Sequence, residues 1–195
     1  MGNKEQYFIV FLNLLHKPYS TLKTVKESKK KLAYAFYTLF LFSAFAMTNM
    51  LCYHFSRVSL DIWWPPFIRV SEEFVWILSF FLMIPVAILG AIMYAGIIQI
   101  LSKLFGGKGN FESQFALFLF SYPLYFIILH IIKFVYFLFT HESLGGYVLM
   151  IFAVFSYVLM LLSVKIEQEI KWFPAILISL PTTAIVAFFS MTYIR

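Results

Sequence analysis

Residues 74–101 read FVWILSFFLMIPVAILGAIMYAGIIQIL, a run of twenty-eight residues without a single charged side chain. A helix needs about 20 apolar residues to cross the roughly 30 Å hydrocarbon core of a bilayer. In lipid the backbone must satisfy its own polar groups, and the lack of strict apolar–polar alternation argues against a barrel strand. This stretch therefore predicts a transmembrane helix and an integral membrane protein.

The rest of the chain has the same character. Four further apolar runs cover residues 32–53, 115–139, 144–164 and 172–194. The chain is 62% hydrophobic and only 12% charged, whereas a soluble domain averages about 25% charged residues. Its 195 residues leave no room for a sizeable soluble domain. We therefore predict an all-α integral membrane protein in which residues 32–195 form a domain of five transmembrane helices.

Residues 1–31 form a basic leader before the first span. Beyond Pro18, the apolar residues Leu22, Val25 and Leu32 can share one face of a helix, with lysines over the rest. This pattern predicts a short interfacial amphipathic helix against anionic lipid headgroups, with a solvated basic leader as the alternative. The lysines expected to touch lipid are Lys23, Lys26, Lys29 and Lys30.

Basic residues are divided unequally between the two sides of the membrane. Seven lysines precede the first span, and the second-to-third and fourth-to-fifth loops add two each, which puts eleven on one side. The other side has three basic residues, which are Arg57, Arg69 and Arg195. Since basic loops stay inside, the N-terminus is predicted to be cytoplasmic and the C-terminus outside or lumenal. A net charge of +6 placed around the spans indicates lipid headgroups as partners, and no nucleic acid.

The sequence contains no familiar set of catalytic or metal-binding residues. HExxH and GxSxG motifs are absent, Asp61 is the only aspartate, and the four histidines lack metal-ligand spacing. We therefore expect no enzymatic activity, no metal and no cofactor. Lys133 is the one basic residue within a span, and a helix from Phe111 places it about 33 Å along, where it would snorkel to the outer headgroups. Gln99 and Asn49 are expected to form hydrogen bonds between helices.

Prolines and small residues indicate how the spans would bend and pack. Pro85, Pro123 and Pro181 each interrupt a span, where they predict kinks or freed carbonyls. Small residues give the second span a smooth face for a neighbouring helix. These small residues are Ala87, Gly90, Ala91 and Ala95. Kinked helices lining a path would also fit a small oligomeric transporter or channel, which stays open as an alternative function.

A glycine-rich turn, GGKG at residues 106–109, separates the second and third spans. A phosphate loop requires Ser or Thr after its lysine and a strand before it, whereas here Gly109 follows Lys108 and a transmembrane helix comes before the turn. Its glycines instead suit the end of a helix, because glycine adopts positive φ readily, and Asn110 is suited to cap the next helix. The turn is therefore predicted to connect two helices, with Lys108 facing the anionic lipid surface.

The same stretch carries a family resemblance. Residues 106–123, GGKGNFESQFALFLFSYP, resemble the Gly-Gly, then Phe, then Tyr-Ser-x-x-Pro-type signature of the Yip1 domain family, with Tyr122 and Pro123 adjacent here. Residues 13–27, NLLHKPYSTLKTVKE, resemble the leader of its short prokaryotic members, with Lys17 where the family often has Asn. The resemblance covers nearly the whole chain. It agrees with five spans and a cytoplasmic N-terminus, and implies the cytoplasmic membrane of a prokaryote.

The resemblance also implies a role. Eukaryotic relatives engage Rab-type GTPases in vesicle traffic, and they carry a longer N-terminal region with an Asp-Leu-Tyr-Gly-Pro motif that this chain lacks. We therefore expect a non-enzymatic membrane organiser or adaptor whose cytoplasmic face meets anionic lipids and a protein partner, with a homo-oligomer also compatible. The residues expected to carry this role are Gly106, Gly107, Lys108, Gly109, Tyr122 and Pro123. The loop KIEQEIKW, residues 165–172, is expected to be a solvated turn, with a docking surface shared with the GGKG turn as the alternative.

Overall fold

The computed structural model describes residues 3–55, 72–140 and 146–193, and over these ranges it contains eight helices and no strand. The helices are α1 (Asn3–His16), α2 (Pro18–Glu27), α3 (Lys31–Phe55), α4 (Glu72–Lys103), α5 (Phe111–Ser121), α6 (Pro123–Thr140), α7 (Gly146–Gln168) and α8 (Trp172–Tyr193). The predicted all-α fold is therefore confirmed. The arginines on which the predicted orientation partly depends, Arg57, Arg69 and Arg195, and the aspartate Asp61 lie outside the described residues.

Four stretches of helix are long and apolar enough to cross a bilayer. They are Lys31–Asn49, Ile84–Lys103, Phe111–Thr140 and Ile151–Gln168. The third stretch consists of α5 and α6, which meet at Tyr122 and Pro123. The predicted fifth span falls on α8, whose apolar stretch among the described residues is shorter, Trp172–Ile185. The chain is a multi-pass integral membrane protein.

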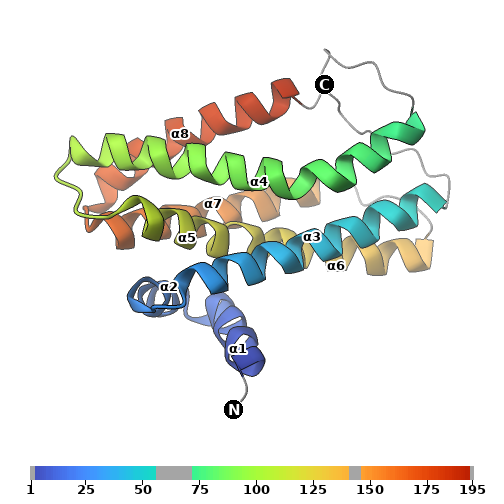
Figure 1. The fold of residues 1–195 in the computed structure, drawn as a ribbon, viewed down its shortest axis with the longest axis horizontal. Helices are drawn as coiled ribbons and strands as arrows, with labels where there is room; N and C mark the ends of the chain where they lie inside the picture. The colour runs from blue at the N-terminus through green and yellow to red at the C-terminus, as the bar shows by residue number, and fades with distance from the viewer. Residues whose placement is uncertain (1–2, 56–71, 141–145, 194–195) are drawn as a thin grey trace.

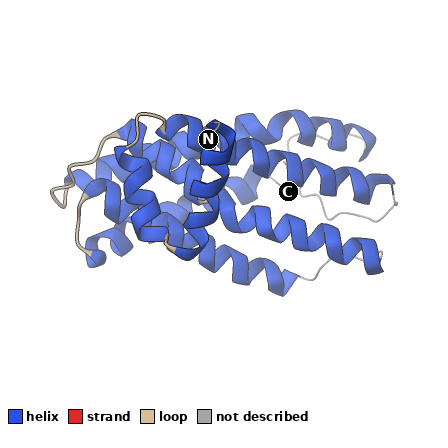
Figure 2. Ribbon diagram, turned by 90° about the horizontal axis from the view of Figure 1, so that it is seen from below, coloured by secondary structure: helices blue, strands red, loops and turns tan. Residues whose placement is uncertain are grey.

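The long helices run side by side along the long axis of the molecule, whereas α1 and α2 lie across the bundle toward one end (Figure 1). The α4–α5 loop and the α7–α8 turn lie at this same end, which we call the loop end (Figure 1). A hydrogen bond of 3.0 Å from the Lys108 amide to the Gln168 carbonyl joins these two connections directly. Figure 2 shows the same arrangement from below, with loops gathered toward the loop end.

Helix α5 is the central element of the bundle. Every residue from Ser113 to Ser121 is buried, because α2, α3, α4 and α7 all pack against this helix. A helix that is buried on all sides is expected to be apolar all round, as most of α5 is. At Pro123, which lacks an N–H for the helical ladder, α5 gives way to α6, whose outward residues Ile131 and Phe139 are exposed. The third span therefore passes from the core of the bundle to its surface.

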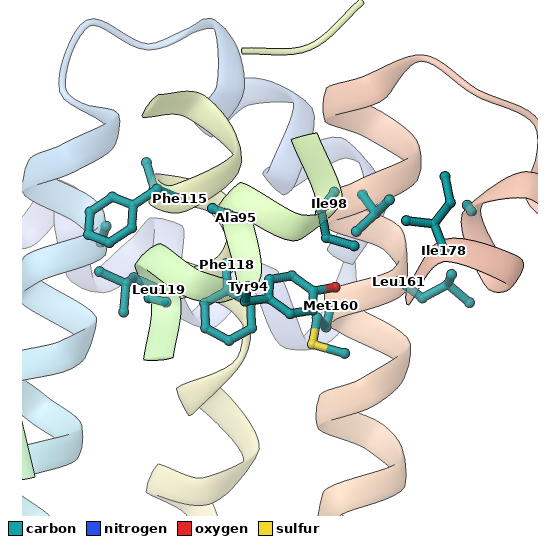
Figure 3. Packing of buried hydrophobic residues seen from close by; sticks show 14 of the residues in the cluster. Tyr94, Ala95, Ile98, Phe115, Phe118, Leu119, Met160, Leu161 and Ile178 are labelled. Atoms are coloured by element: carbon teal, nitrogen blue, oxygen red, sulfur yellow. The ribbon is translucent and has the colours of Figure 1, made fainter. Parts of the chain in front are cut away.

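The largest group of buried apolar side chains joins α4, α5, α7 and α8 (Figure 3). At its centre the rings of Tyr94 and Phe118 stack with their centroids 4.3 Å apart, and Met160 of α7 lies beside them. This group of side chains holds α4 and α8 against the central helix.

Small residues on α4 lie in three different surroundings. Ala91 and Ala95 are fully buried in the core, where a small side chain permits close approach of a neighbouring helix. Ala87 is half-buried. A Cβ at Gly90 would meet no atom within 4 Å. The close contacts of α4 therefore lie toward the loop end of the helix.

Candidate functional site at the loop end

The site begins where α4 stops. Gly106 has a φ of +73°, a left-handed conformation that residues with a Cβ disfavour. Its amide donates to the Lys103 carbonyl (3.2 Å), and the amide of Gly107 donates to the Ser102 carbonyl (2.8 Å). This pair of bonds is a Schellman motif, which satisfies carbonyls that the end of a helix leaves free. The first glycine of the GGKG turn therefore terminates α4.

The GGKG turn packs tightly against the end of α7. A Cβ at Gly109 would lie 2.7 Å from the Glu167 carbonyl oxygen, and one at Gly107 would lie 2.8 Å from the Cβ of Ser102. Both glycines are buried, whereas the Lys108 side chain between them is exposed. The turn therefore has room only for glycine at its two buried positions, and it presents one lysine outward.

A buried carboxylate from α7 holds the start of α5. Glu167 is only 1% exposed. Its Oε1 accepts a hydrogen bond from the Asn110 amide (3.0 Å), and its Oε2 accepts one from the Ser113 hydroxyl (2.6 Å). The Asn110 side chain accepts from the Ser113 amide at 2.8 Å, which confirms the predicted N-cap. Two donors and the positive end of the α5 dipole thus compensate the burial of the Glu167 charge.

Polar side chains beside this carboxylate form a cluster, the amide network, which consists of the half-buried Gln99 and the buried Ser102, Gln114 and Gln168. The Gln168 Nε2 donates to the side-chain oxygens of Gln99 (3.1 Å) and Gln114 (3.2 Å). Its Oε1 accepts from the Ser102 hydroxyl at 2.8 Å. Gln99 Nε2 donates to the Gly109 carbonyl at 2.8 Å. The network therefore ties α4, α5 and α7 to the GGKG turn, and the predicted interhelical hydrogen bonding of Gln99 is confirmed.

The expectation of a solvated turn at residues 165–172 is wrong for its middle. Glu167 and Gln168 are buried, because the GGKG turn and the start of α5 cover them and supply their hydrogen-bond partners. Gln114 was not predicted to be part of a site. A detectable signal existed, since Gln114 is a polar residue at the very edge of an apolar run, where it needs a partner.

Helix α2 reaches the same place through one lysine. Lys26 Nζ donates to the carbonyls of Ile166 (2.9 Å) and Glu167 (3.3 Å) and to the Glu169 carboxylate (3.0 Å). A cation at a helix C-terminus satisfies free carbonyls and complements the dipole. Lys26 is half-buried and is therefore engaged by the protein itself. The other lysines predicted to touch lipid, which are Lys23, Lys29 and Lys30, are exposed.

Glu169 follows α7 in an uncommon backbone conformation. Its φ of 56° lies in the left-handed region, which disfavours a residue with a Cβ by about 1 kcal/mol. The hydrogen bond and the charge of Lys26 hold the pKa of the Glu169 carboxyl below its usual value of 4.5. The contact with Lys26 thus offsets part of the strain at a position where glycine would be favoured.

Comparison with known proteins adds the family. The model of the Yip1 domain matches residues 12–194, nearly the whole chain. The chain belongs to the Yip1 domain family. No curated protein and no solved structure matches it. Yip1 domain proteins are membrane proteins not known for enzymatic activity. Among the described residues, no three His, Cys, Asp or Glu side chains gather where they could hold a metal ion.

Within residues 106–123, the residues that carry the Yip1 resemblance lie at two separate places. Residues 106–109 form the turn described above. Tyr122 and Pro123 lie at the other end of α5, about 17 Å farther along the third span at 1.5 Å per residue. There Tyr122 stacks on Phe118 with ring centroids 5.1 Å apart, and Pro123 is buried. Only the glycine-rich part of the stretch therefore belongs to the loop end.

Two further polar residues of this Yip1-domain chain lie away from the loop end. Asn49 Nδ2 donates to the His130 carbonyl at 2.8 Å and lies 3.1 Å from its Nδ1, so the predicted interhelical hydrogen bonding of Asn49 is confirmed. Lys133 is half-buried on α6, about two turns before the helix ends. Neither residue contributes to the amide network.

Proposed function

We propose that this Yip1-domain protein is a non-enzymatic membrane organiser or adaptor that acts through its loop end, which faces the cytoplasm. The observation that supports this most is that α2 and the GGKG turn are both hydrogen-bonded to the end of α7, through the Lys26 side chain and the Lys108 amide. A surface fixed in this way loses little freedom when a partner binds, which favours its use for docking. The exposed lysines around it include Lys23, Lys29, Lys103 and Lys108.

The proposed orientation rests on the same charges. Lysines of the leader and of both loops lie at the loop end, as the positive-inside rule expects of a cytoplasmic end. We also infer five spans. Helix α8 has 22 residues and at 1.5 Å per residue extends about 33 Å, enough to cross the hydrocarbon core. This crossing would place the C-terminus outside or in a lumen.

A transporter or channel receives less support from the same structure. Gln99, which would mark a polar path, is committed to the amide network. Helices α4 and α8 continue through Pro85 and Pro181, whose rings are exposed on the outside of the bundle. These residues therefore serve internal contacts or face lipid, and they do not converge on a path through one chain.

Cysteine labelling tests the orientation. The chain has one cysteine, Cys52, so Cys52→Ser provides a cysteine-free background. In that background, Lys108→Cys is expected to resist a membrane-impermeant maleimide in intact cells and to react once the membrane is opened. Reaction in intact cells would reverse the proposed orientation.

Photo-crosslinking in living cells tests the adaptor role. A photoreactive residue in place of Lys108 is expected to capture a defined cytoplasmic protein. The matched control is the same residue in place of Phe139, which is 83% exposed near the end of α6. Identical products from both positions, or no protein captured at position 108, would contradict the adaptor role.

A further inference from the structure

A groove lies beside the α7–α8 turn at the loop end. It has a volume of about 600 Å³ and is open to its surroundings. Its lining consists of Lys165, Glu169, Ile170, Lys171, Trp172 and Phe173. The one carboxylate among them, Glu169, is already paired with Lys26 at 3.0 Å. The ionic character of the groove therefore depends on its two lysines.

Both lysines keep their charge available for a ligand. Lys165 Nζ lies 4.5 Å from the ring centroid of Trp172 and 5.4 Å from that of Tyr19. Such cation–π contacts hold an ammonium group in position without neutralising it. Neither Lys165 nor Lys171 forms an ion pair with a carboxylate of the described residues. The groove therefore offers two positive charges to an anion.

The first turn of α8 adds backbone donors on the same side. Lys171, the residue before the helix, has no side-chain oxygen that could cap it. The first helical bond of this turn runs from the Ala175 amide to the Lys171 carbonyl (3.1 Å), and Pro174 has no N–H. The amides of Trp172 and Phe173 therefore have no acceptor within the helix. Together with the two lysines, such amides favour a phosphate group.

Next to these charges the surface becomes apolar. Trp172 and Phe173 are 48% and 73% exposed, and Ile176 and Leu177 in the next turn of α8 are exposed as well. Tryptophan is favoured at the level of lipid headgroups, and the apolar residues beyond it face the acyl chains in a membrane. The groove thus combines a cationic rim with an apolar wall, which suits a ligand that is both anionic and apolar.

We propose that this groove binds the headgroup of an anionic phospholipid. The lipid phosphate lies between the ammonium groups of Lys165 and Lys171 at the first turn of α8, and the acyl chains lie along Phe173 and Leu177. The ligand is a lipid and not a soluble anion, because the apolar wall continues along the exposed face of α8, which we infer to be the fifth span. The site does not use the GGKG turn, so its loss leaves the adaptor role testable by capture at position 108.

Native mass spectrometry of the full chain tests this proposal. The protein is released from nanodiscs of phosphatidylglycerol and phosphatidylcholine, and the retained lipids are counted. Since each lysine near an anionic surface contributes about fivefold to binding, Lys165→Gln with Lys171→Gln is expected to lower phosphatidylglycerol retention roughly 25-fold. Retention of phosphatidylcholine should not change. Replacing both lysines with arginine should preserve phosphatidylglycerol retention.

The matched control is Lys23→Gln with Lys29→Gln, which removes the same charge from exposed leader positions. It is expected to lower phosphatidylglycerol retention by no more than about fivefold, because these exposed lysines attract the lipid surface without enclosing a headgroup. An equal loss in both double variants, or full retention in the groove variant, would overturn the specific site. A second measurement uses the wild-type chain and therefore does not depend on whether the groove variant folds. A photoactivatable phosphatidylglycerol should label the wild-type chain within residues 165–177, and labelling elsewhere alone would also overturn the site.

Discussion

At the loop end, side-chain hydrogen bonds connect α4, α5 and α7 to the GGKG turn, whereas the middle of the bundle depends mainly on apolar and aromatic packing. In that middle part the hydroxyls of Ser43, Tyr94 and Ser156 are buried without a hydrogen-bond partner, whereas at the loop end one such atom, the Gln114 Nε2, is found among the described residues. The two regions therefore satisfy their polar groups to different degrees.

The difference matters because the bilayer changes the forces between helices. Lipid tails are as apolar as the helices, so the hydrophobic effect does not drive two spans together, and close packing and interhelical hydrogen bonds determine their relative position. The span of α4, Ile84–Lys103, is only 22% buried, whereas the span formed by α5 and α6 is 61% buried. We infer that the amide network and Glu167 set the positions of α4 and α7 against the central helix, while the rest of the bundle adapts to them.

The largest expected effect comes from removing the Glu167 carboxylate. Glu167→Ala leaves the Asn110 amide and the buried Ser113 hydroxyl without their acceptor, which is expected to cost about 3 kcal/mol in the free energy of unfolding. Reversible unfolding by SDS measures this loss. Amide hydrogen exchange should also rise in residues 106–114 before it rises near Asn49.

The control for that experiment is Glu167→Gln, which has nearly the same shape and keeps one carbonyl oxygen for the Asn110 amide. It is expected to lose roughly half as much stability as the alanine variant. Equal exchange at both ends of the bundle in Glu167→Ala would refute the view that this carboxylate organises the loop end in particular.

A smaller loss is expected when the close approach at Gly109 is blocked. In Gly109→Ala the new Cβ would meet the Glu167 carbonyl at 2.7 Å, and the required shift is expected to cost about 2 kcal/mol. Gly90→Ala is the matched control, since nothing lies within 4 Å of its Cβ position and alanine favours a helix by up to about 1 kcal/mol. Opposite signs of the two stability changes are therefore predicted, and equal losses would count against a tightly packed turn.

The sequence predicted the parts of this structure that depend on local patterns. Long apolar runs predicted the helices, and Asn110 before the third span predicted its N-cap. The burial of Glu167 and Gln168 could not be inferred in the same way, because their neighbours Lys165 and Glu169 give the segment the composition of a solvated turn. Their partners lie more than fifty residues away in sequence, and only the folded arrangement of the two connections brings them together.

The same limit applies to the leader lysines. Lys23, Lys26, Lys29 and Lys30 have equivalent surroundings in sequence, and sequence alone could not show that Lys26 reaches the end of α7. Lys26→Met is therefore expected to destabilise the contact between α2 and α7 by about 1 kcal/mol. Lys23→Met should leave the contact unchanged, because Lys23 is exposed. Hydrogen exchange of α2 measures the difference, and equal effects of the two substitutions would argue against a specific cap.

The smallest effect is expected when the pH is lowered until Glu169, the acidic partner of Lys26, becomes protonated. Lys26 holds the pKa of the Glu169 carboxyl below 4.5 in the folded chain, so the contribution of this pair is fully present above the unfolded pKa. This contribution is lost as the pH falls through the pKa that the Glu169 carboxyl has in the folded chain. Exchange protection of α2, corrected for the intrinsic rate, should therefore decline only below pH 4.5, and Glu169→Gln should abolish the decline. A decline centred near neutral pH, or one that persists in Glu169→Gln, would mean that another group controls how α2 is attached to the loop end.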